Sequence, residues 1–440
     1  MNTHQASRWT TRTCLASALA LSAALVTTPA ALAQRAAAPL AVAPPQAAGV
    51  SPQRLERLTA AFTKEVDEKR LPGVVMMISR KGKLVYSQAI GLRDPKAADS
   101  ARADTLFRIY SMTKPMVSVA AIILMEDGVL QLSDPVSKWL PPFKDVKVST
   151  AAGEVAPERP MTVQDLLRHT AGLPYGELTA NAAVKEALTK AGIFKPNVIE
   201  FDIRDLTPAE FVERLAKVPL IHQPGTTWEY SLASDVLGRV VEAASKKRLG
   251  DFMAERIFQP LGMNDTAFFV PAGKLRRLAE PFEKDAVSGA PIRLIDASKQ
   301  PGNDSGGAGL ISSAGDYLRF AQMMANGGTL GGKRILSRTS VKLMTSDHLG
   351  KIQTAATPGG GVLGSRPYTF GLGFAVRPAD GLAPIAGSAG DFDWDGYAGT
   401  SFWVDPKEQL VAVMMVQSAG TLRLHHRNLF RQLVYQAIAD

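Results

Sequence analysis

The sequence predicts an α/β fold in which the two ends of the chain build one antiparallel sheet with flanking helices. Strand patterns gather before residue 91 and again after residue 369, while helix and loop patterns fill the middle of the chain. Hairpin turns at Lys81-Gly82 and Asp405-Pro406 favour antiparallel pairing within each group. We therefore expect a mainly helical part inserted at about residues 134–300, with the site in the crevice between the two parts.

Residues 1–33 have the pattern of an export signal, with Arg8 and Arg12 ahead of an apolar run. Ala31-Leu32-Ala33 then forms an A-x-A cleavage site. We expect cleavage of this signal peptide and a periplasmic or secreted protein of bacterial type. The alternative is an uncleaved membrane anchor, which is disfavoured because Pro29 interrupts a run already rich in Ala and Ser.

The composition suits a folded, soluble protein of 440 residues, of which 46% are hydrophobic and 21% are charged. The formal net charge of +9 comes from scattered lysines and arginines without interleaved aromatic residues, so we expect no nucleic-acid partner. Cys14 is the only cysteine and lies in the expected signal, so the mature chain would form no disulfide. No later run approaches the ~18 apolar residues of a membrane span, so no stable span should remain after cleavage. These patterns do not give the oligomeric state.

After a flexible lead-in at residues 34–50, we place the folded domain at residues 51–440. Ser51-Pro52 is the cap and first residue of a helix with apolar residues at helical spacing, and the apolar run from Met116 to Met125 forms a second helix. The stretch from Ala180 to Asp205 mixes helix formers with a turn and is expected to form part of a lid. Further helices are expected at 163–169, 207–216, 231–244, 313–324 and 422–438.

The expected strands are runs rich in apolar and β-branched residues, bounded by turn residues. The Gly-rich, apolar-poor stretch from Leu349 to Pro367 interrupts the second group and is expected to be a mobile loop. The expected strands lie at 74–79, 83–90, 370–376, 400–404 and 409–416.

The candidate catalytic residues begin with Ser111-Met112-Thr113-Lys114, just before the apolar helical run. Residues three apart share one face of a helix, so Ser111 and Lys114 would point the same way. Serine needs a neighbour that takes its proton, and lysine can do this only while it is neutral. Burial and the positive end of a helix both lower the pKa of a lysine. Alone, the motif is weak, and the alternative is a helix cap followed by a solvated lysine.

Two later stretches supply partners for this serine. Tyr230 follows a Pro-Gly turn and precedes a helix, which suits a phenol that points into a cleft. Such a phenol could shuttle a proton if a nearby lysinium lowered its pKa. Trp394-Asp395-Gly396-Tyr397 leads into an expected strand, where the N–H of Tyr397 could join that of Ser111 to hold an oxyanion. The alternatives are an ordinary buried tyrosine and a Gly-containing entry to an edge strand.

Together these motifs resemble the serine β-lactamase-related superfamily, in particular the class C β-lactamase-like branch that includes the family VIII carboxylesterases. The resemblance extends from about Pro52 to the C-terminus. Residues 165–173 and 306–313 support it. The residues that carry it are Ser111-Met112-Thr113-Lys114, Tyr230-Ser231-Leu232 and Trp394-Asp395-Gly396.

This resemblance implies a β-lactamase/penicillin-binding transpeptidase-like fold and an acyl-enzyme mechanism. Ser111 would attack the carbonyl, while Lys114 and Tyr230 would share the general-base and general-acid work in an order that the sequence leaves open. The N–H groups of Ser111 and Tyr397 would form the oxyanion hole. Trp394 and Gly396 would belong to the substrate-binding site.

The departures from the family pattern indicate the substrate class. In class C β-lactamases the two later triplets are Tyr-x-Asn and Lys-Thr-Gly, whereas this chain has Leu232 and Trp394-Asp395 at the differing positions. An amide and a lysine that would hold a β-lactam are therefore absent. We also expect Asp391, Asp393 and Asp395 to crowd the strand entrance with negative charge. The expected activity is that of a carboxylesterase on small neutral esters.

Other activities remain as alternatives. The same scaffold could be a β-lactamase, a D-amino-acid peptidase or a transacylase, and the non-enzyme alternative is a penicillin-binding-like module that only binds its ligand. An α/β-hydrolase elbow is disfavoured because Gly-x-Ser-x-Gly is absent. The histidines show no zinc-ligand spacing, and His425-His426 is expected to be a solvated pair on the last helix. We expect no cofactor and no metal site.

Overall fold

The structure is a computed structural model and describes residues 40–195, 203–364 and 366–440. The expected signal at 1–33, residues 34–39 of the expected lead-in and residues 196–202 of the expected lid lie outside the described residues. In the described chain, no helix combines the length and the apolar character needed to cross a membrane.

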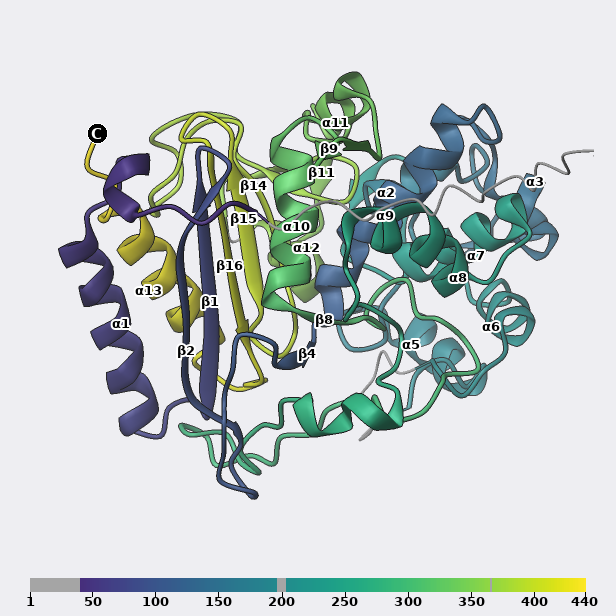
Figure 1. The fold of residues 1–440 in the computed structure, drawn as a ribbon. Coiled ribbons are helices and arrows are strands. Elements are labelled where there is room, and N and C mark those ends of the chain that lie inside the picture. The colour runs from purple at the N-terminus through teal and green to yellow at the C-terminus, as the bar shows by residue number, and fades with distance from the viewer. Residues whose placement is uncertain (1–39, 196–202, 365) are drawn as a thin grey trace, which may run out of the picture. The chain divides into compact units, whose positions relative to one another are not determined.

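The described chain is organised around an eight-stranded sheet in which each neighbouring pair of strands is antiparallel (Figure 1). Both groups of predicted strands contribute to it. The strands, in order across the sheet, are β12 Thr369–Phe370, β13 Ala375–Val376, β14 Phe392–Asp395, β15 Ser401–Asp405, β16 Leu410–Val416, β1 Gly73–Arg80, β2 Lys83–Asp94 and β3 Asp99–Ser100.

The two ends of the chain meet inside this sheet, between β1 and β16. Val74 lies opposite Val416, and Met77 lies opposite Val413. The two predicted hairpins, β1–β2 and β15–β16, flank this junction. The prediction that both chain ends build one antiparallel sheet is therefore confirmed.

The central strands β1 and β16 are buried on both faces because helices cover each face of the sheet (Figure 1). Successive residues of β1 point to opposite faces, so Val74 and Met76 join one core while Val75 and Met77 join the other. The first core includes residues of α1 and α13, and the second includes residues of α2 and α10. These helices are α1 Pro52–Asp67, α2 Thr113–Glu126, α10 Ala314–Ala325 and α13 Arg423–Tyr435.

Capping residues set the starts of several helices where the sequence predicts them. The Ser51 hydroxyl accepts from the Arg54 amide at the start of α1, and Thr162, Thr207 and Ser313 cap later helices in the same way. The α-helices described between α2 and α10 are α3 Val136–Trp139, α4 Val163–Leu167, α5 Ala182–Lys190, α6 Pro208–Leu215, α7 Ala233–Ser245, α8 Leu249–Met253 and α9 Gln259–Leu261.

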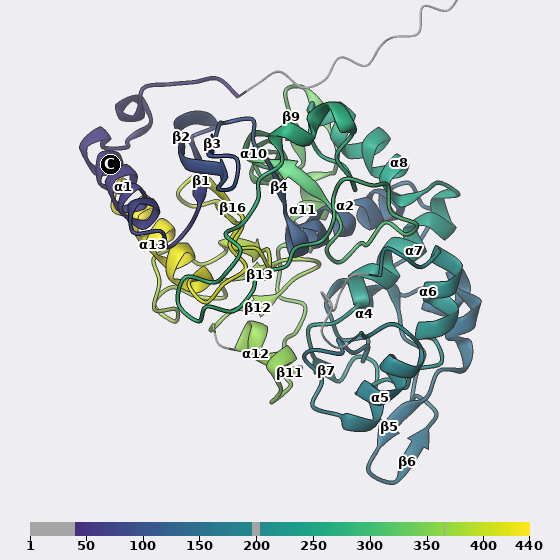
Figure 2. The same cartoon turned by 90° about the horizontal axis from the view of Figure 1, so that it is seen from below.

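Short strand pairs join these helices to the rest of the fold. β4 (Leu106–Arg108) pairs with β8 (Ile311–Ser313). This pairing holds the chain just before Ser111 beside the 306–313 stretch. β7 (Thr227–Trp228) pairs with β11 (Gln353–Thr354), as Figure 2 shows. The smaller remaining elements are β5 Val148–Thr150, β6 Gly153–Val155, β9 Thr329–Leu330, β10 Lys333–Arg334 and α11 Arg338–Met344.

Three sequence predictions are wrong in detail. The single strand expected at 370–376 is a pair, β12 and β13, because Gly373 turns the chain with a φ of 92°. A Cβ at this glycine would lie 2.3 Å from the Ser118 hydroxyl, so other residues do not fit. The loop expected at 349–367 contains the short helix α12 (Pro358–Gly364) as well as β11. Residues of the expected flexible lead-in also bind β2, since the Ala43 amide donates to the Leu84 carbonyl at 3.0 Å.

Candidate active site

The predicted site residues come together at one cavity of about 680 Å³. These residues lie on the turn before α2, the segment before α7 and the end of β14. The walls of the cavity include apolar residues from α12 and from the loop that precedes β14. The predicted site residues that line it are Ser111, Tyr230, Trp394, Gly396 and Tyr397.

Ser111 lies in a single 3₁₀ turn, Tyr110–Met112, that leads directly into α2. Tyr110 has a φ of 45°, a left-handed conformation that costs roughly 1–2 kcal/mol for a residue with a Cβ. Its surroundings hold it there: the Tyr110 hydroxyl accepts from the Ile295 amide at 3.0 Å, and its ring packs edge-on against Tyr397 at 5.4 Å. This turn aims Ser111 into the cavity.

Lys114 is buried one helical turn beyond Ser111, with 1% of its surface exposed. Its Nζ lies 3.2 Å from the Ser111 Oγ, 3.3 Å from the Tyr175 hydroxyl and 2.8 Å from the Gly307 carbonyl. Burial lowers the pKa of Lys114 to about 7, although the charge of the Asp235 carboxylate opposes this shift. A large share of the side chain is therefore neutral near pH 7 and able to accept a proton.

Tyr230 completes the group, because its hydroxyl donates to the Ser111 Oγ at 2.6 Å. Lys114 Nζ lies 4.4 Å from the centre of its ring. Burial raises the pKa of the Tyr230 hydroxyl, which is opposite to the lowered pKa considered from the sequence. The expected direction is wrong because loss of solvation outweighs the interactions with the Ser111 and Trp394 side chains, which lower the pKa of Tyr230. Tyr230 is thus a protonated phenol at neutral pH.

Two residues at this site were not found from the sequence. Tyr175 lies immediately after the 165–173 stretch, and its hydroxyl accepts from Lys114. Asp235 lies on α7, where its Oδ1 accepts from the Ser305 hydroxyl at 2.6 Å and the Gly307 amide at 3.0 Å. Both are buried. The sequence offered one signal for each residue. Tyr175 lies beside the 165–173 stretch that resembles the family, and Asp235 lies five residues after Tyr230.

The Trp394–Tyr397 segment forms the wall opposite α2. Trp394 is on β14, and its ring packs 5.4 Å from that of Tyr230. β14 was not predicted from the sequence; it pairs with β13 and β15 on its two sides, and the strand expected at 400–404 is β15. A Cβ at Gly396 would lie 2.4 Å from the Ile109 carbonyl, so a glycine lets this wall approach the Ser111 turn. The oxyanion role of the Ser111 and Tyr397 amides stays a prediction.

The expected patch of negative charge is absent from this wall. Asp391, Asp393 and Asp395 each lie within ion-pair distance of arginines that come from distant parts of the sequence. Burial raises the pKa of Asp391 to about 6, and two arginines oppose that shift. The part of the argument against anionic substrates that rests on these three carboxylates is therefore wrong. The pairs are Asp391–Arg377, Asp391–Arg431, Asp393–Arg366, Asp393–Arg431 and Asp395–Arg427.

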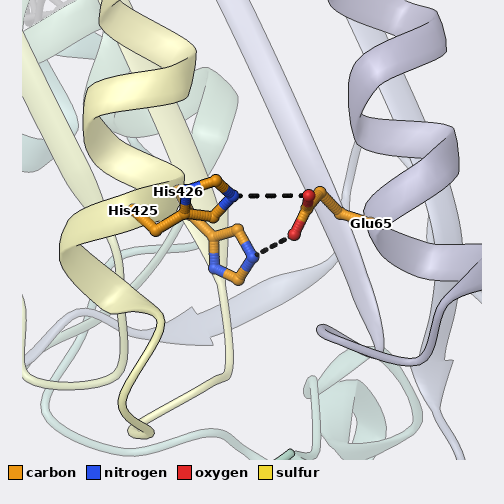
Figure 3. A group of neighbouring side chains, drawn as sticks. All are labelled: Glu65, His425 and His426. Atoms are coloured by element: carbon orange, nitrogen blue, oxygen red, sulfur yellow. Dashed lines mark hydrogen bonds and ion pairs between the residues drawn. The ribbon is translucent and has the colours of Figure 1, made fainter. Parts of the chain in front are cut away.

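The expected solvated pair, His425-His426, is also wrong. His426 is 1% exposed, and both imidazoles reach Glu65 on α1 (Figure 3). Neighbouring side chains diverge on a helix, but a carboxylate with two oxygens can meet both of them. Among the described residues, these three form a group whose possible ligand atoms lie within 4.8 Å of one another.

Comparisons with known proteins find relatives that match most of the chain. The family model described as Beta-lactamase matches residues 58–436. Esterase EstB of Burkholderia gladioli is 34% identical over 386 residues, which cover 82% of this chain and 90% of EstB. Lovastatin esterase of Penicillium rubens is 28% identical and covers 86% of this chain and 98% of its own length. The solved structure of EstCE1, described as a hydrolase with promiscuous acyltransferase activity, has a TM-score of 0.73 and 28% identity, covering 87% of this chain and 98% of its own.

Proposed function

The chain belongs to the β-lactamase family and is a serine hydrolase, and from this we propose that it is an exported carboxylesterase acting on small neutral esters through an acyl-enzyme on Ser111. One observation carries the proposal: the Ser111 Oγ lies between Lys114 Nζ at 3.2 Å and the Tyr230 hydroxyl at 2.6 Å, at the wall of the cavity. A nucleophile, a base and an acid are thus within reach of one bound carbonyl.

The pKa values favour Lys114 as the first base. With its pKa lowered to about 7, neutral Lys114 accepts the Ser111 proton as the Oγ attacks the ester carbonyl. Tyr230, whose pKa is raised, keeps its proton until it donates to the leaving alkoxide. Lys114 then returns its proton to Tyr230. Water repeats the sequence on the acyl-enzyme, with Ser111 as the leaving group.

The cavity favours an ester over a β-lactam for reasons of shape and hydrogen bonding. Leu232 stands where an asparagine amide would be and is 2% exposed, so its side chain offers no polar contact. Apolar groups from Leu178, Val362 and Ile385 line the cavity beside Trp394, which suits an apolar acyl group. The names of EstB and lovastatin esterase support the same activity.

Acyl transfer to an alcohol is the second candidate, because a cavity of about 680 Å³ has room for an acceptor beside a small acyl group. The promiscuous acyltransferase activity described for EstCE1 supports this candidate. Hydrolysis and transfer share the acyl-enzyme and differ in whether water or an alcohol reaches it. The ratio of the two products in the presence of a simple alcohol would measure this.

The test is a substrate panel on the purified protein without its signal. We expect p-nitrophenyl acetate and butyrate to be hydrolysed with a higher kcat/KM than a chromogenic cephalosporin. Ser111→Ala should abolish turnover and labelling by a fluorophosphonate probe, whereas Ser87→Ala, at an exposed serine of β2, should change neither. A cephalosporin turned over faster than each ester would make the chain a β-lactamase instead. Absence of Ser111-dependent labelling would point to a binding module.

Export is part of this proposal and has its own test. The motivating feature is the pattern at residues 1–33, with its A-x-A motif ending at Ala33. Expression of the full chain in a Gram-negative host should yield a periplasmic protein that begins at Gln34 by intact-mass measurement. Ala33→Arg should leave the precursor uncleaved. An uncleaved wild-type chain in the membrane fraction would instead favour the anchor.

A further inference from the structure

Glu65, His425 and His426 bring three potential metal ligands together on the face of the sheet that α1 and α13 cover (Figure 3). His426 Nε2 lies 3.0 Å from Glu65 Oε2, and His425 Nε2 lies 3.3 Å from Glu65 Oε1. Both imidazoles therefore direct Nε2, a common ligand atom for metal ions, toward one carboxylate. The expected esterase mechanism uses none of these three side chains.

The spacing is close to what a tetrahedral metal ion requires. Ligands that lie 2.0–2.1 Å from zinc are separated by about 3.3 Å from one another in a tetrahedron. The separation of 3.0 Å between His426 Nε2 and Glu65 Oε2 is close to this value, while His425 Nε2 lies 3.3 Å from the other oxygen, Oε1. The possible ligand atoms of the three residues all lie within 4.8 Å of one another. His425 is 45% exposed at its side chain, so it can rotate to close that last gap.

The surroundings suit a site that is supported on one side and open on the other. The rings of Phe62 and Phe430 belong to the core beside His426, and the Phe62 ring lies 6.4 Å from the His426 ring. On the open side, water can reach the exposed His425. Two imidazoles and one carboxylate leave the fourth position of a tetrahedral ion for that water.

Arg70 is a positive charge that would compete with a metal ion for the Glu65 carboxylate. Its Nη1 donates to Glu65 Oε1 at 3.1 Å, while its Nη2 lies 3.1 Å from Glu68 Oε2. A carboxylate that binds a metal through one oxygen keeps the other for a hydrogen bond, and such outer partners commonly orient metal ligands. Arg70 can therefore hold Oε1 while Oε2 binds the ion together with His426, and the exposed His425 would turn from Oε1 toward that ion. Glu68 balances its charge.

We propose that Glu65, His425 and His426 bind one divalent transition-metal ion of the zinc type, which ties helix α1 to helix α13. The ligand types, two imidazole nitrogens and a carboxylate oxygen, favour Zn²⁺ over Mg²⁺ or Ca²⁺, which prefer oxygen ligands alone. The ion would link residues from the two ends of the domain. Its effect is on stability, because a ligand that binds only the folded state stabilises it.

The experiment uses untagged, chelator-treated protein and calorimetric titration with ZnCl₂, followed by thermal unfolding. Wild type should bind one Zn²⁺ per chain, and at about 100 times Kd the Tm should rise by about 3 °C or more. His425→Gln and Glu65→Gln should each weaken binding at least 10-fold and lose most of the rise in Tm. His425 is exposed, so its variant is expected to fold, and Glu65→Gln keeps the side-chain shape.

The matched control is His222→Gln. His222 Nε2 also lies near a carboxylate, at 2.6 Å from Glu229, but the described residues offer no third ligand there. This variant should bind Zn²⁺ as wild type does. If wild type binds no more tightly than His425→Gln, or if its Tm does not respond to Zn²⁺, the proposal is wrong and the group is a hydrogen-bonded contact between two helices.

Discussion

Asp235 and Lys114 are linked through a single residue, Gly307. The Gly307 amide donates to Asp235 at 3.0 Å, and the Gly307 carbonyl accepts from Lys114 at 2.8 Å. A Cβ at Gly307 would lie 2.3 Å from the Asp235 carboxylate, so only a glycine fits between them. The carboxylate thereby positions the backbone that holds Lys114, the proposed base, and its charge raises the lysine pKa that burial lowers.

The first prediction is that wild-type kcat/KM for a neutral ester rises with pH through an apparent pKa of about 7. Burial lowers the pKa of Lys114 to about 7, and only its neutral form accepts the Ser111 proton. Activity should therefore be low below pH 6 and level off above pH 8. A pH–rate profile from pH 5 to 9 measures this, and a flat profile across that range would exclude Lys114 as the titrating base.

Asp235→Asn should move this acid limb to lower pH. The carboxylate favours the charged form of Lys114, so its removal lowers the pKa of the lysine further. Asp316→Asn is the matched control, since Asp316 is another buried carboxylate but binds Thr266 and the Asp265 amide instead. In Asp316→Asn, kcat/KM should rise at the same pH as in wild type. If Asp235→Asn lowers kcat but leaves the apparent pKa of the pH–rate profile unchanged, Asp235 has only a structural role.

Lys114→Ala should lower kcat/KM by about 10²–10⁴-fold, the usual worth of a positioned general base. Lys114→Arg should fail to a similar extent, because a guanidinium does not lose its proton in this pH range. Lys144→Arg, at an exposed lysine, controls for the chemical change and should retain activity. Steady-state kinetics on p-nitrophenyl butyrate give these values. Near-normal turnover by Lys114→Arg would mean that another group accepts the Ser111 proton.

The two tyrosines that surround Lys114 should differ strongly in their effects. Tyr230→Phe removes the hydroxyl 2.6 Å from Ser111 and should lower kcat by about 10²-fold or more. Tyr175→Phe makes the same change in the same cavity, but its hydroxyl accepts from Lys114, at 3.3 Å, whereas that of Tyr230 donates to Ser111. We expect less than about a 10-fold loss there. Equal losses in both variants would mean that the Tyr230 proton is not transferred.

Arg427 is predicted to position the oxyanion-binding backbone from α13. Its Nη2 donates to the Gly396 carbonyl, and its Nη1 pairs with Asp395 at 3.4 Å. Arg427→Gln should lower kcat by about 10-fold with little change in KM, because an oxyanion is held only in the transition state. Arg256→Gln, which breaks a surface pair with Asp127, is the control. A raised KM with unchanged kcat would mean that Arg427 contacts substrate directly.

Local signals explain what could be predicted from the sequence. Hairpin turns, helix caps and the three-residue spacing from Ser111 to Lys114 each depend on neighbours in the chain, so the sheet and the helix starts were found. Features that depend on distant partners were missed. In the sequence, the aspartates near Trp394 suggest a negative patch. In the folded structure, Arg366, Arg377 and Arg431 form ion pairs with them. Glu65 likewise lies far from the histidines that it meets.

The meeting of β1 with β16 also determines when the protein can finish folding. β1 is synthesised long before β16, the strand that covers its second edge. Until then the nascent chain carries a strand that is apolar from Val74 to Ile78 and has one unpaired edge, which invites aggregation unless a chaperone covers it. Fragments that end before residue 410 should therefore be recovered as aggregates or chaperone complexes, whatever the number of helices they contain.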